Sequence, residues 1–553
     1  MAGFEPTSRE RNLVRLSDES FDLLVIGGGI TGAGVAREAA LRGLTVALVE
    51  ARDFGSGTSG RSSKLIHGGL RYLQQGEVAL VREAATERLA LRRIAPHLTS
   101  KVLMLVPVYG RTSAGMYKLR AGLTLFDKLA AVDASERHRM LTRDEVLAAV
   151  PALEPDRLQG AAVYPEYVTD DARLVLDTLK SAHAAGAVVL NHTRVTALGP
   201  PELLRRAELI DEERATPLTT RARVVVNAAG PWVDRVRELD RPGERPVLQL
   251  TKGIHLVFPR ALLPASHCVV MRGEDGRPLF TVPNGVHVYV GTTDTTYDGP
   301  LEEPAVTLED AEYVLATLRR TFPGLVLRAD QVVGTWAGLR PLIHEAGRRP
   351  SEISRKDEIA VGASGLVTIA GGKLTTYRRM AERVLETAAP ALGGVRPASR
   401  SDRLPLAGGD LEGAPDLASY AASLVVRAGM EGIGPETMAR LLATYGSDTL
   451  EVVRAADRPD ELAPLASGVA LTAAEVRHAV RHEMACALAD VLERRTRLAL
   501  FATADARAVA PIVASIMASE RQWTDGRRAS ELARFDGLAA ARLGWRAGSE
   551  GAS

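Results

Sequence analysis

The chain is poor in cysteine, in aromatic residues and in long apolar segments. Only Cys268 and Cys486 occur among 553 residues, which excludes a disulfide framework and leaves no metal-binding cysteine motif. No apolar run approaches the roughly 18 residues that cross a bilayer, and the polar first twenty residues lack the apolar core of a secretory signal. We therefore expect a cytoplasmic protein, or at most one that is peripheral on the cytoplasmic face of the inner membrane.

Net charge is almost absent as well. Lys and Arg number 69 and Asp and Glu 68, a formal net charge of +1, so the chain lacks the overall basic field of nucleic-acid-binding proteins. Nucleic acid is therefore not expected as a partner. Eight of the basic residues are lysine and 61 are arginine, so one arginine taken alone says little about function.

Length and composition favour a large globular protein. At roughly 100–200 residues per domain, the chain holds about three to five domain-sized units. With 46% hydrophobic and 25% charged residues, it is close to the average of folded soluble proteins.

The first patterned segment predicts a dinucleotide site. Residues 21–26 are rich in β-formers and run into Gly27, Gly29 and Gly32, which fit the spacing G-x-G-x-x-G. These glycines permit a tight turn, let a pyrophosphate approach the backbone, and let the following helix pack on the strand. A second predicted strand ends at Glu50, where a carboxylate binds ribose hydroxyls. These features alone leave FAD and NAD as alternatives.

A Ser/Gly-rich loop at 58–73, TSGRSSKLIHGGLRYL, resolves that choice by resemblance. It closely resembles the respiratory, quinone-linked, FAD-dependent glycerol-3-phosphate dehydrogenases. Further matching blocks follow in the order of that family at 170–174, 227–233, 252–255, 291–294, 338–342, 371–378, 481–483 and 494–496. The resemblance spans nearly the whole chain and implies an enzyme of glycerol metabolism.

The resemblance implies an α/β FAD-binding domain, Rossmann-like and similar to D-amino-acid oxidase, with an antiparallel β-sheet substrate domain and a C-terminal α-helical domain. Short β-rich runs in 247–293 and an apolar stripe at helical spacing in 473–494 support it. We expect a flexible N-terminus at 1–20, an FAD-dependent oxidoreductase region at 21–400, a helical domain at 401–540 and a flexible tail at 541–553. Within 21–400, we expect the FAD domain at about 21–100, 170–235 and 335–395, interleaved with the substrate domain at about 101–169 and 236–334.

FAD is the cofactor that the resemblance implies, and no metal is expected. A second glycine turn, at 371–373, could direct backbone N–H groups at the flavin. We expect cofactor contacts from Gly27, Gly29, Ile30, Thr31, Gly32, Glu50, Thr58, Ser62, Ser63, Lys64, Leu65, His67, Gly68, Val195, Ala228, Ala229, Gly230, Trp232, Gly372, Lys373, Leu374 and Thr375.

Four cations in the matching blocks are candidates for holding a phosphate dianion: Arg71, Arg340, Arg355 and Lys373. Guanidinium groups offer bidentate geometry and an ammonium offers a point charge. The register of Arg355 is uncertain, because the family usually has an aromatic residue soon after Arg-Asp, whereas here an extra Lys356 separates Arg355 from Asp357.

A proton acceptor is also needed, and histidine is suited to it near neutral pH. His255 is the candidate general base, although a strand histidine could equally bind flavin or pack. His67 is the weaker competitor, because its loop belongs to the expected cofactor contacts. Tyr72 could hydrogen-bond a substrate oxygen or simply pack.

The expected reaction converts sn-glycerol 3-phosphate to dihydroxyacetone phosphate, with hydride transfer to FAD and electrons passed to a respiratory quinone. A soluble oxidase that uses oxygen is the alternative; a non-catalytic flavin-binding protein and an FAD-dependent RNA-modifying protein are weaker ones. Residues 116–130 carry apolar positions at helical spacing flanked by Lys118, Arg120 and Lys128, typical either of a helix on a membrane surface or of one packed on its own core. The sequence leaves open whether the protein forms a homodimer.

Overall fold

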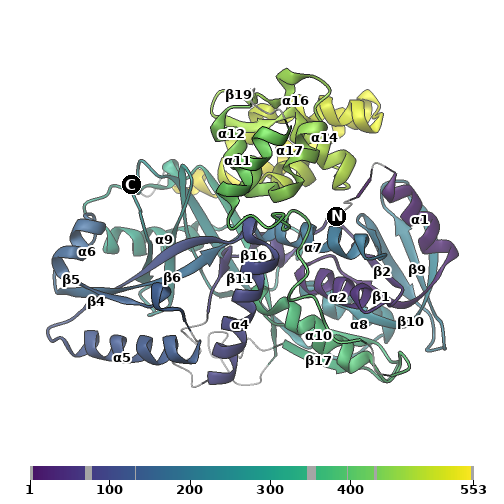
Figure 1. Ribbon diagram of the computed structural model, residues 1–553, viewed down its shortest axis with the longest axis horizontal. Helices are drawn as coiled ribbons and strands as arrows, with labels where there is room; N and C mark the ends of the chain where they lie inside the picture. Colours follow the sequence, from purple (N-terminus) through teal and green to yellow (C-terminus); the bar gives the residue numbers. More distant parts are fainter. Residues whose placement is uncertain are drawn as a thin grey trace.

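The computed structural model describes residues 4–5, 7–68, 77–130, 132–344, 357–394, 397–428 and 433–549. Figure 1 shows a mixed α/β domain on the right, a β-rich domain on the left, and a helical domain that lies over both. The expected fold class is confirmed. Three predicted site residues, Arg71, Tyr72 and Arg355, lie outside the described residues.

The α/β domain is built on a largely parallel sheet. The central strands β1 (Ser20–Ile26) and β2 (Val46–Val49) are nearly continuous apolar runs because both faces of the sheet are covered. Helix α2 (Ile30–Leu41) packs against α7 (Asp171–Ala184) and α10 (Tyr377–Ala388). The strand order is β17 (Asp357–Val361), β18 (Val367–Gly371), β10 (Thr216–Asn227), β1, β2, β7 (Val188–Leu190), with β9 (Arg205–Asp211) on β10 and β8 (Thr193–Leu198) on β9.

The β-rich domain is a larger, mostly antiparallel sheet. Its strands run β15 (Thr295–Thr296), β11 (Leu248–Pro259), β14 (His287–Gly291), β13 (Pro278–Asn284), β12 (Cys268–Arg272), β4 (Ser100–Tyr109), β6 (Leu158–Val168) and β3 (Leu65–Ile66). Strand β16 (Gly334–Ile343) pairs with β11, and β5 (Arg139–Thr142) pairs with β6. Helices α6 (Arg143–Ala149) and α9 (Leu308–Thr321) share an apolar core with this sheet, while α5 (Ala114–Leu129) contacts β4 and β6.

Two strands depart from the expected domain boundaries. Residues 335–395 were expected in the FAD domain, but β16 pairs along its length with β11 of the substrate sheet, which places Arg340 opposite Thr251. The short strand β3, expected within 21–100, pairs with β6 of the same sheet. Both strands join the two domains, so they bring FAD-domain loops against the substrate sheet.

The C-terminal domain is helical, as expected, but its predicted long helix at 473–494 is interrupted. Helix α14 (Ala473–His482) ends before Met484, whose φ of 53° is left-handed, and a π-helix, η10 (Asp490–Arg495), follows. The break turns the carboxylate of Glu483 toward Arg173. The other elements are α11 (Leu417–Ala428), α12 (Pro435–Tyr445), α13 (Thr449–Arg454), β19 (Pro464–Ala466), β20 (Val469–Thr472), α15 (Leu498–Phe501), α16 (Thr503–Arg521) and α17 (Asp525–Leu543).

Both expected flexible ends are largely ordered, which corrects the sequence prediction. Helix α1 (Ser8–Asp18) buries Leu16, and its Arg9 forms an ion pair of 2.7 Å with Asp211. At the other end, Trp545 is buried in the core of the β-rich domain. Among the residues that the structure describes, no helix is both long and apolar enough to cross a bilayer.

Candidate active site

The first glycine turn forms the cradle that the sequence predicts. Gly27, between β1 and α2, has a φ of 116°, and a Cβ there would lie 2.6 Å from the carbonyl oxygen of Ala228. A Cβ on Gly32 would lie 1.9 Å from the carbonyl oxygen of Gly27. Helix α2 begins after Gly29, which has no side chain to cap it, and its first turn, which contains Ile30 and Thr31, has no acidic residue. Ser59 Oγ, a neutral group, accepts from the N–H of Ile30 at 2.9 Å. The helix N-terminus is therefore suited to a pyrophosphate.

Glu50 lies at the end of β2, beside this turn. Its carboxylate accepts hydrogen bonds from the backbone N–H groups of Gly28 at 2.7 Å and Arg52 at 2.9 Å. Burial raises the pKa of Glu50, against the effect of these hydrogen bonds. The position matches the carboxylate that binds ribose hydroxyls in dinucleotide sites.

The segment after β10 closes the turn from the other side. Ala228 donates its N–H to the carbonyl of Ile26 at 2.9 Å, and Gly230 adopts a left-handed φ of 55°. A Cβ on Gly57 would lie 2.9 Å from the ring of Trp232, so that indole packs on the loop after β2. Val195 is buried in the apolar core around the sheet.

A cavity of about 1380 Å³ opens between the α/β and β-rich domains. Ligand sites usually measure about 300–1,000 Å³, so this one has room for a flavin ring and a small substrate. Residues from three separate segments, 58–67, 340–342 and 371–375, meet in its wall. The predicted residues that line it are Thr58, Ser62, Ser63, Leu65, His67, Arg340, Gly372, Lys373, Leu374 and Thr375.

Two of the predicted cations share this cavity. The guanidinium of Arg340 donates to Thr292 Oγ1 at 3.0 Å, to the carbonyl of Thr293 at 3.1 Å and to Asp294 Oδ1 at 3.1 Å. Lys373 directly follows Gly372, whose φ of 85° turns the chain out of β18. The three hydrogen bonds hold the guanidinium of Arg340 in one orientation. Lys373 lines the same cavity from the FAD domain.

The two candidate histidines occupy different places. The imidazole of His255 is buried, stacks on Trp336 at 4.7 Å, and lies 2.9 Å through Nε2 from Ser63 Oγ. Burial, with Arg340 and Lys64 nearby, lowers the pKa of His255 well below its usual range. His255 is therefore a neutral group behind Ser63, whereas His67 lines the cavity itself.

Several of the residues predicted to contact the cofactor also hold their own loop in place. The ammonium of Lys64 is buried and binds Asp171 Oδ1 at 2.6 Å and the carbonyl of Gly60 at 3.1 Å. Ser62 Oγ donates to Asp171 at 2.7 Å, and Gly68 donates its N–H to Glu166 at 2.9 Å. These bonds fix the cavity wall.

No motif in the sequence predicts a second group of charged residues in the cavity wall. Lys118, Arg272, Arg277 and Arg320 line it together with the carboxylates of Glu154 and Asp275. These arginines belong to no glycine-rich block, and among 61 arginines their type alone does not distinguish them.

Comparison with known proteins agrees with this geometry. Residues 22–378 match the family model described as FAD dependent oxidoreductase, and residues 399–528 match the C-terminal domain of alpha-glycerophosphate oxidase. The chain is thus an FAD-dependent oxidoreductase, and the glycine cradle and the cavity fit that cofactor. It is 39% identical over 534 residues to the aerobic glycerol-3-phosphate dehydrogenase of Bacillus subtilis (strain 168), covering 94% of this chain and 95% of the relative. The corresponding Staphylococcus aureus (strain USA300) protein is 39% identical over 520 residues, covering 92% of each chain.

Solved structures extend the likeness. The glycerol-3-phosphate dehydrogenase of Bacillus halodurans, complexed with FAD, superposes with a TM-score of 0.82 at 35% identity and covers 98% of both chains. The L-alpha-glycerophosphate oxidase of Mycoplasma pneumoniae shares the fold, with a TM-score of 0.55 at 16% identity over 70% of this chain and 99% of that one. The chain belongs to the family of the aerobic glycerol-3-phosphate dehydrogenases.

Proposed function

We propose that the protein oxidises sn-glycerol 3-phosphate to dihydroxyacetone phosphate with FAD as the hydride acceptor, and that a respiratory quinone then takes the electrons. The observation that carries this proposal is the meeting of Arg340 and Lys373, from distant segments, in the cavity that His67 also lines. Two cations match a phosphate dianion, and a histidine in the same cavity matches the loss of a hydroxyl proton. The dehydrogenases to which the chain is 39% identical support the same substrate.

Phosphate binding is assigned to Arg340 and Lys373. The guanidinium of Arg340 is held by Thr292 and Asp294, so it is already oriented when substrate arrives and loses little conformational freedom on binding. The Lys373 ammonium adds a point charge from a separate segment of the cavity wall.

His67 is assigned the role of the base that removes the hydroxyl proton of the substrate. A histidine imidazole can accept such a proton near neutral pH. His255 is better suited to orienting Ser63, because its Nε2 contacts Ser63 Oγ and its lowered pKa makes it a weak proton acceptor. When bound, FAD supplies the redox chemistry.

The quinone assignment rests on the apolar part of the cavity wall. Met104 and Val106 of β4, Leu119 and Leu123 of α5, and Phe280 of β13 line it. A quinone is an apolar ring with polar oxygens, so an apolar wall beside the flavin region suits it.

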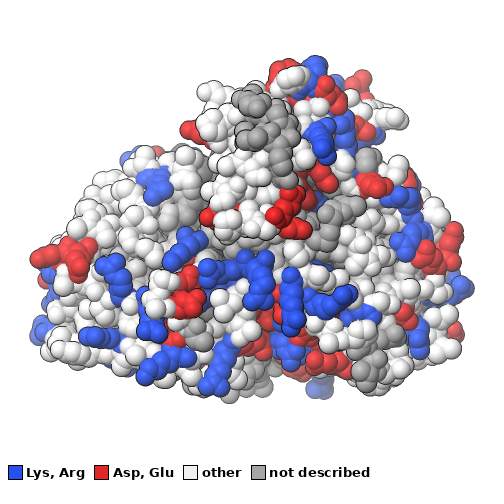
Figure 2. Space-filling view, viewed as in Figure 1, with Lys and Arg blue, Asp and Glu red and all other residues white. Residues whose placement is uncertain are grey.

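Helix α5 also supports contact with a membrane surface. Leu123 and Phe126 pack into the core of the protein, as the core-packed interpretation of this segment predicts. The helix nevertheless exposes Tyr117 at 69% and Leu125 at 48% beside the exposed Lys118. Leu125 and Lys118 also line the cavity, so Tyr117 is the better probe of a separate surface contact. Figure 2 shows Lys and Arg interspersed with Asp and Glu across the lower half of one face, so attraction to a membrane would come from local groups rather than from a field of one sign.

An oxidase is the second candidate, because the C-terminal region matches a domain described for alpha-glycerophosphate oxidase. The test is to supply the purified protein with sn-glycerol 3-phosphate in air, with and without a soluble quinone analogue, and to measure dihydroxyacetone phosphate, analogue reduction and peroxide. We expect turnover that depends on the analogue, with little peroxide. Equal turnover without the analogue, accompanied by one peroxide per product, would favour the oxidase. No product under either condition would refute both assignments and favour a non-catalytic flavin protein.

A further inference from the structure

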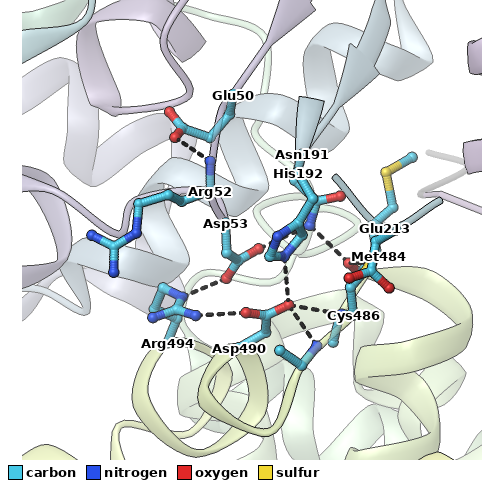
Figure 3. Close-up of polar contacts among 12 residues, drawn as sticks. Glu50, Arg52, Asp53, Asn191, His192, Glu213, Met484, Cys486, Asp490 and Arg494 are labelled. Carbon is cyan, nitrogen blue, oxygen red and sulfur yellow. Dashed lines mark hydrogen bonds and ion pairs between the residues drawn. The ribbon is translucent and has the colours of Figure 1, made fainter. Parts of the chain in front are cut away.

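The C-terminal domain contacts the FAD domain at Asp53, three residues after Glu50 (Figure 3). The segment after β2 and the segment after β7 are joined by three backbone hydrogen bonds: Glu50 donates to Leu190 at 2.9 Å, Thr193 donates to Glu50 at 2.7 Å, and His192 donates to Arg52 at 2.7 Å. The three hydrogen bonds hold the two segments together, and the C-terminal domain contacts both of them.

Asp53 lies at the centre of this contact between the two domains. It is 1% exposed, and its carboxylate accepts from both terminal nitrogens of Arg495, at 2.5 and 3.0 Å, from Nε of Arg494, and from the amide of Asn191 at 3.0 Å. Burial acts to raise the pKa of Asp53, but the two guanidinium groups outweigh it and lower that pKa. Asp53 is thus ionised and fully bonded, with partners from both domains.

The π-helix η10 explains how two successive arginines reach one carboxylate. A wider i→i+5 winding separates consecutive side chains by a smaller angle than an α-helix does, and π-helical turns occur mostly as local features at functional sites. Asp490, the first residue of this turn, accepts from the backbone N–H groups of Cys486 at 2.7 Å and Ala487 at 2.9 Å, and from Arg494 at 2.6 Å. The π-helix therefore begins at a residue whose carboxylate is held in place by hydrogen bonds.

His192, Cys486 and Asp490 also place potential metal ligands within 4.8 Å of one another. The Asp490 carboxylate is already occupied by four donors, including His192 Nε2 at 3.0 Å, and burial raises the pKa of the Cys486 thiol to about 12. With Arg494 adjacent, this arrangement suits an ion-paired domain contact better than a cation site.

We propose that Arg494 and Arg495, acting through Asp53, position Glu50 for the ribose of FAD, so that the C-terminal domain completes the adenosine end of the cofactor site. The Glu50 carboxylate is held by the N–H of Arg52, the residue next to Asp53, so displacement of Asp53 shifts the group that holds Glu50. The two arginines are positioning residues and do not touch FAD. The inference rests on Glu50 as the ribose ligand, and it holds whichever substrate or electron acceptor the protein uses.

The test compares two disruptions of the same domain interface in the holoenzyme. Arg495→Met removes the bidentate bond to Asp53. The control, Asp448→Asn, weakens the buried ion pair of 2.5 Å between Asp448 and Lys180 of α7, which does not contact the 50–53 segment. Measurements are the flavin-to-protein absorbance ratio after gel filtration, the fluorescence of FAD released on dilution, and the Tm with and without added FAD.

For Arg495→Met we expect FAD to dissociate about tenfold more readily, with Arg495→Lys intermediate and the KM for sn-glycerol 3-phosphate unchanged at saturating FAD. Asp448→Asn should lower Tm while FAD release stays within about twofold of the parent. Equal FAD release by the two variants, or unchanged release by Arg495→Met and Arg495→Lys, would overturn the proposal. If Arg495→Met does not fold, the same comparison is made with Arg495→Lys and Arg494→Lys.

Discussion

Replacing Arg340 with alanine should weaken the binding of the substrate phosphate far more than it affects FAD. A charge-assisted hydrogen bond contributes about 1.5–3 kcal/mol, and every 1.4 kcal/mol is about tenfold in affinity. The change also removes the guanidinium that pairs with Asp294 at 3.1 Å, so Arg340 no longer offsets the negative charge of that carboxylate near the incoming dianion. We therefore expect kcat/KM to fall by about 100-fold, mostly through a higher KM.

The assay is steady-state oxidation of sn-glycerol 3-phosphate with a quinone analogue, with the flavin-to-protein ratio measured on each preparation. Arg340→Lys should recover part of the loss, because an ammonium keeps the charge but not the bidentate fork. Arg319→Ala is the matched control: this residue is 50% exposed on α9 and pairs with Glu312, so its kcat/KM should stay within about twofold of the parent. An Arg340→Ala enzyme with unchanged KM would refute the phosphate assignment.

Three further predictions address the cofactor, the domain contact and the membrane. Gly27→Ala should purify with little bound FAD, because the new Cβ would lie 2.6 Å from the carbonyl oxygen of Ala228 at a left-handed φ; a normal flavin-to-protein ratio would contradict this. Burial acts to lower the pKa of His192, but Asp490 outweighs it and raises that pKa above the usual 6.5, so the stabilisation from this pair should be complete below about pH 6.5 and lost as pH rises through the raised pKa. In urea unfolding, the free-energy difference between the parent and His192→Gln should accordingly shrink from pH 6 to pH 9; a constant difference would count against it. Tyr117→Ser should reduce sedimentation with anionic vesicles but leave activity with a soluble quinone analogue unchanged, because Tyr117 is exposed and is not among the residues that line the cavity; unaltered sedimentation would argue against α5 as the contact.

The parts of the fold that the sequence predicts best are those fixed by local backbone chemistry. The turn at Gly27 and the turn at Gly372 each need a left-handed φ, and glycine adopts this at little cost. The strands around them are short runs of β-branched and apolar residues, so strand, turn and helix follow in order. The matching blocks then supply the domain types.

The side-chain geometry of the site was harder to predict because it depends on pairing between distant segments. Whether His255 or His67 faces the cavity is decided by the packing of His255 on Trp336 of β16, and nothing near either histidine in the sequence encodes that contact. The ion pair of Lys64 with Asp171 likewise joins two distant segments, and nothing in the sequence near Lys64 predicts it.

Two errors in the predicted elements have physical causes. The N-terminal helix α1 is polar along much of its length and is stabilised by contacts such as the Arg9–Asp211 ion pair, so its composition resembles that of a free end. The apolar spacing in 473–494 predicts one helix, but the left-handed residue Met484 and the polar network around Asp490 divide it. Tertiary contacts override local periodicity in both places.

The central claim, that sn-glycerol 3-phosphate reduces the flavin of this protein, is tested most directly by its reductive half-reaction. The flavin-loaded protein is mixed anaerobically with sn-glycerol 3-phosphate in a stopped-flow spectrometer while the flavin absorbance is followed, and a quinone analogue is then added. We predict rapid bleaching, followed by recovery of the absorbance when the analogue is added. A flavin-loaded protein whose absorbance does not change with sn-glycerol 3-phosphate would contradict the account.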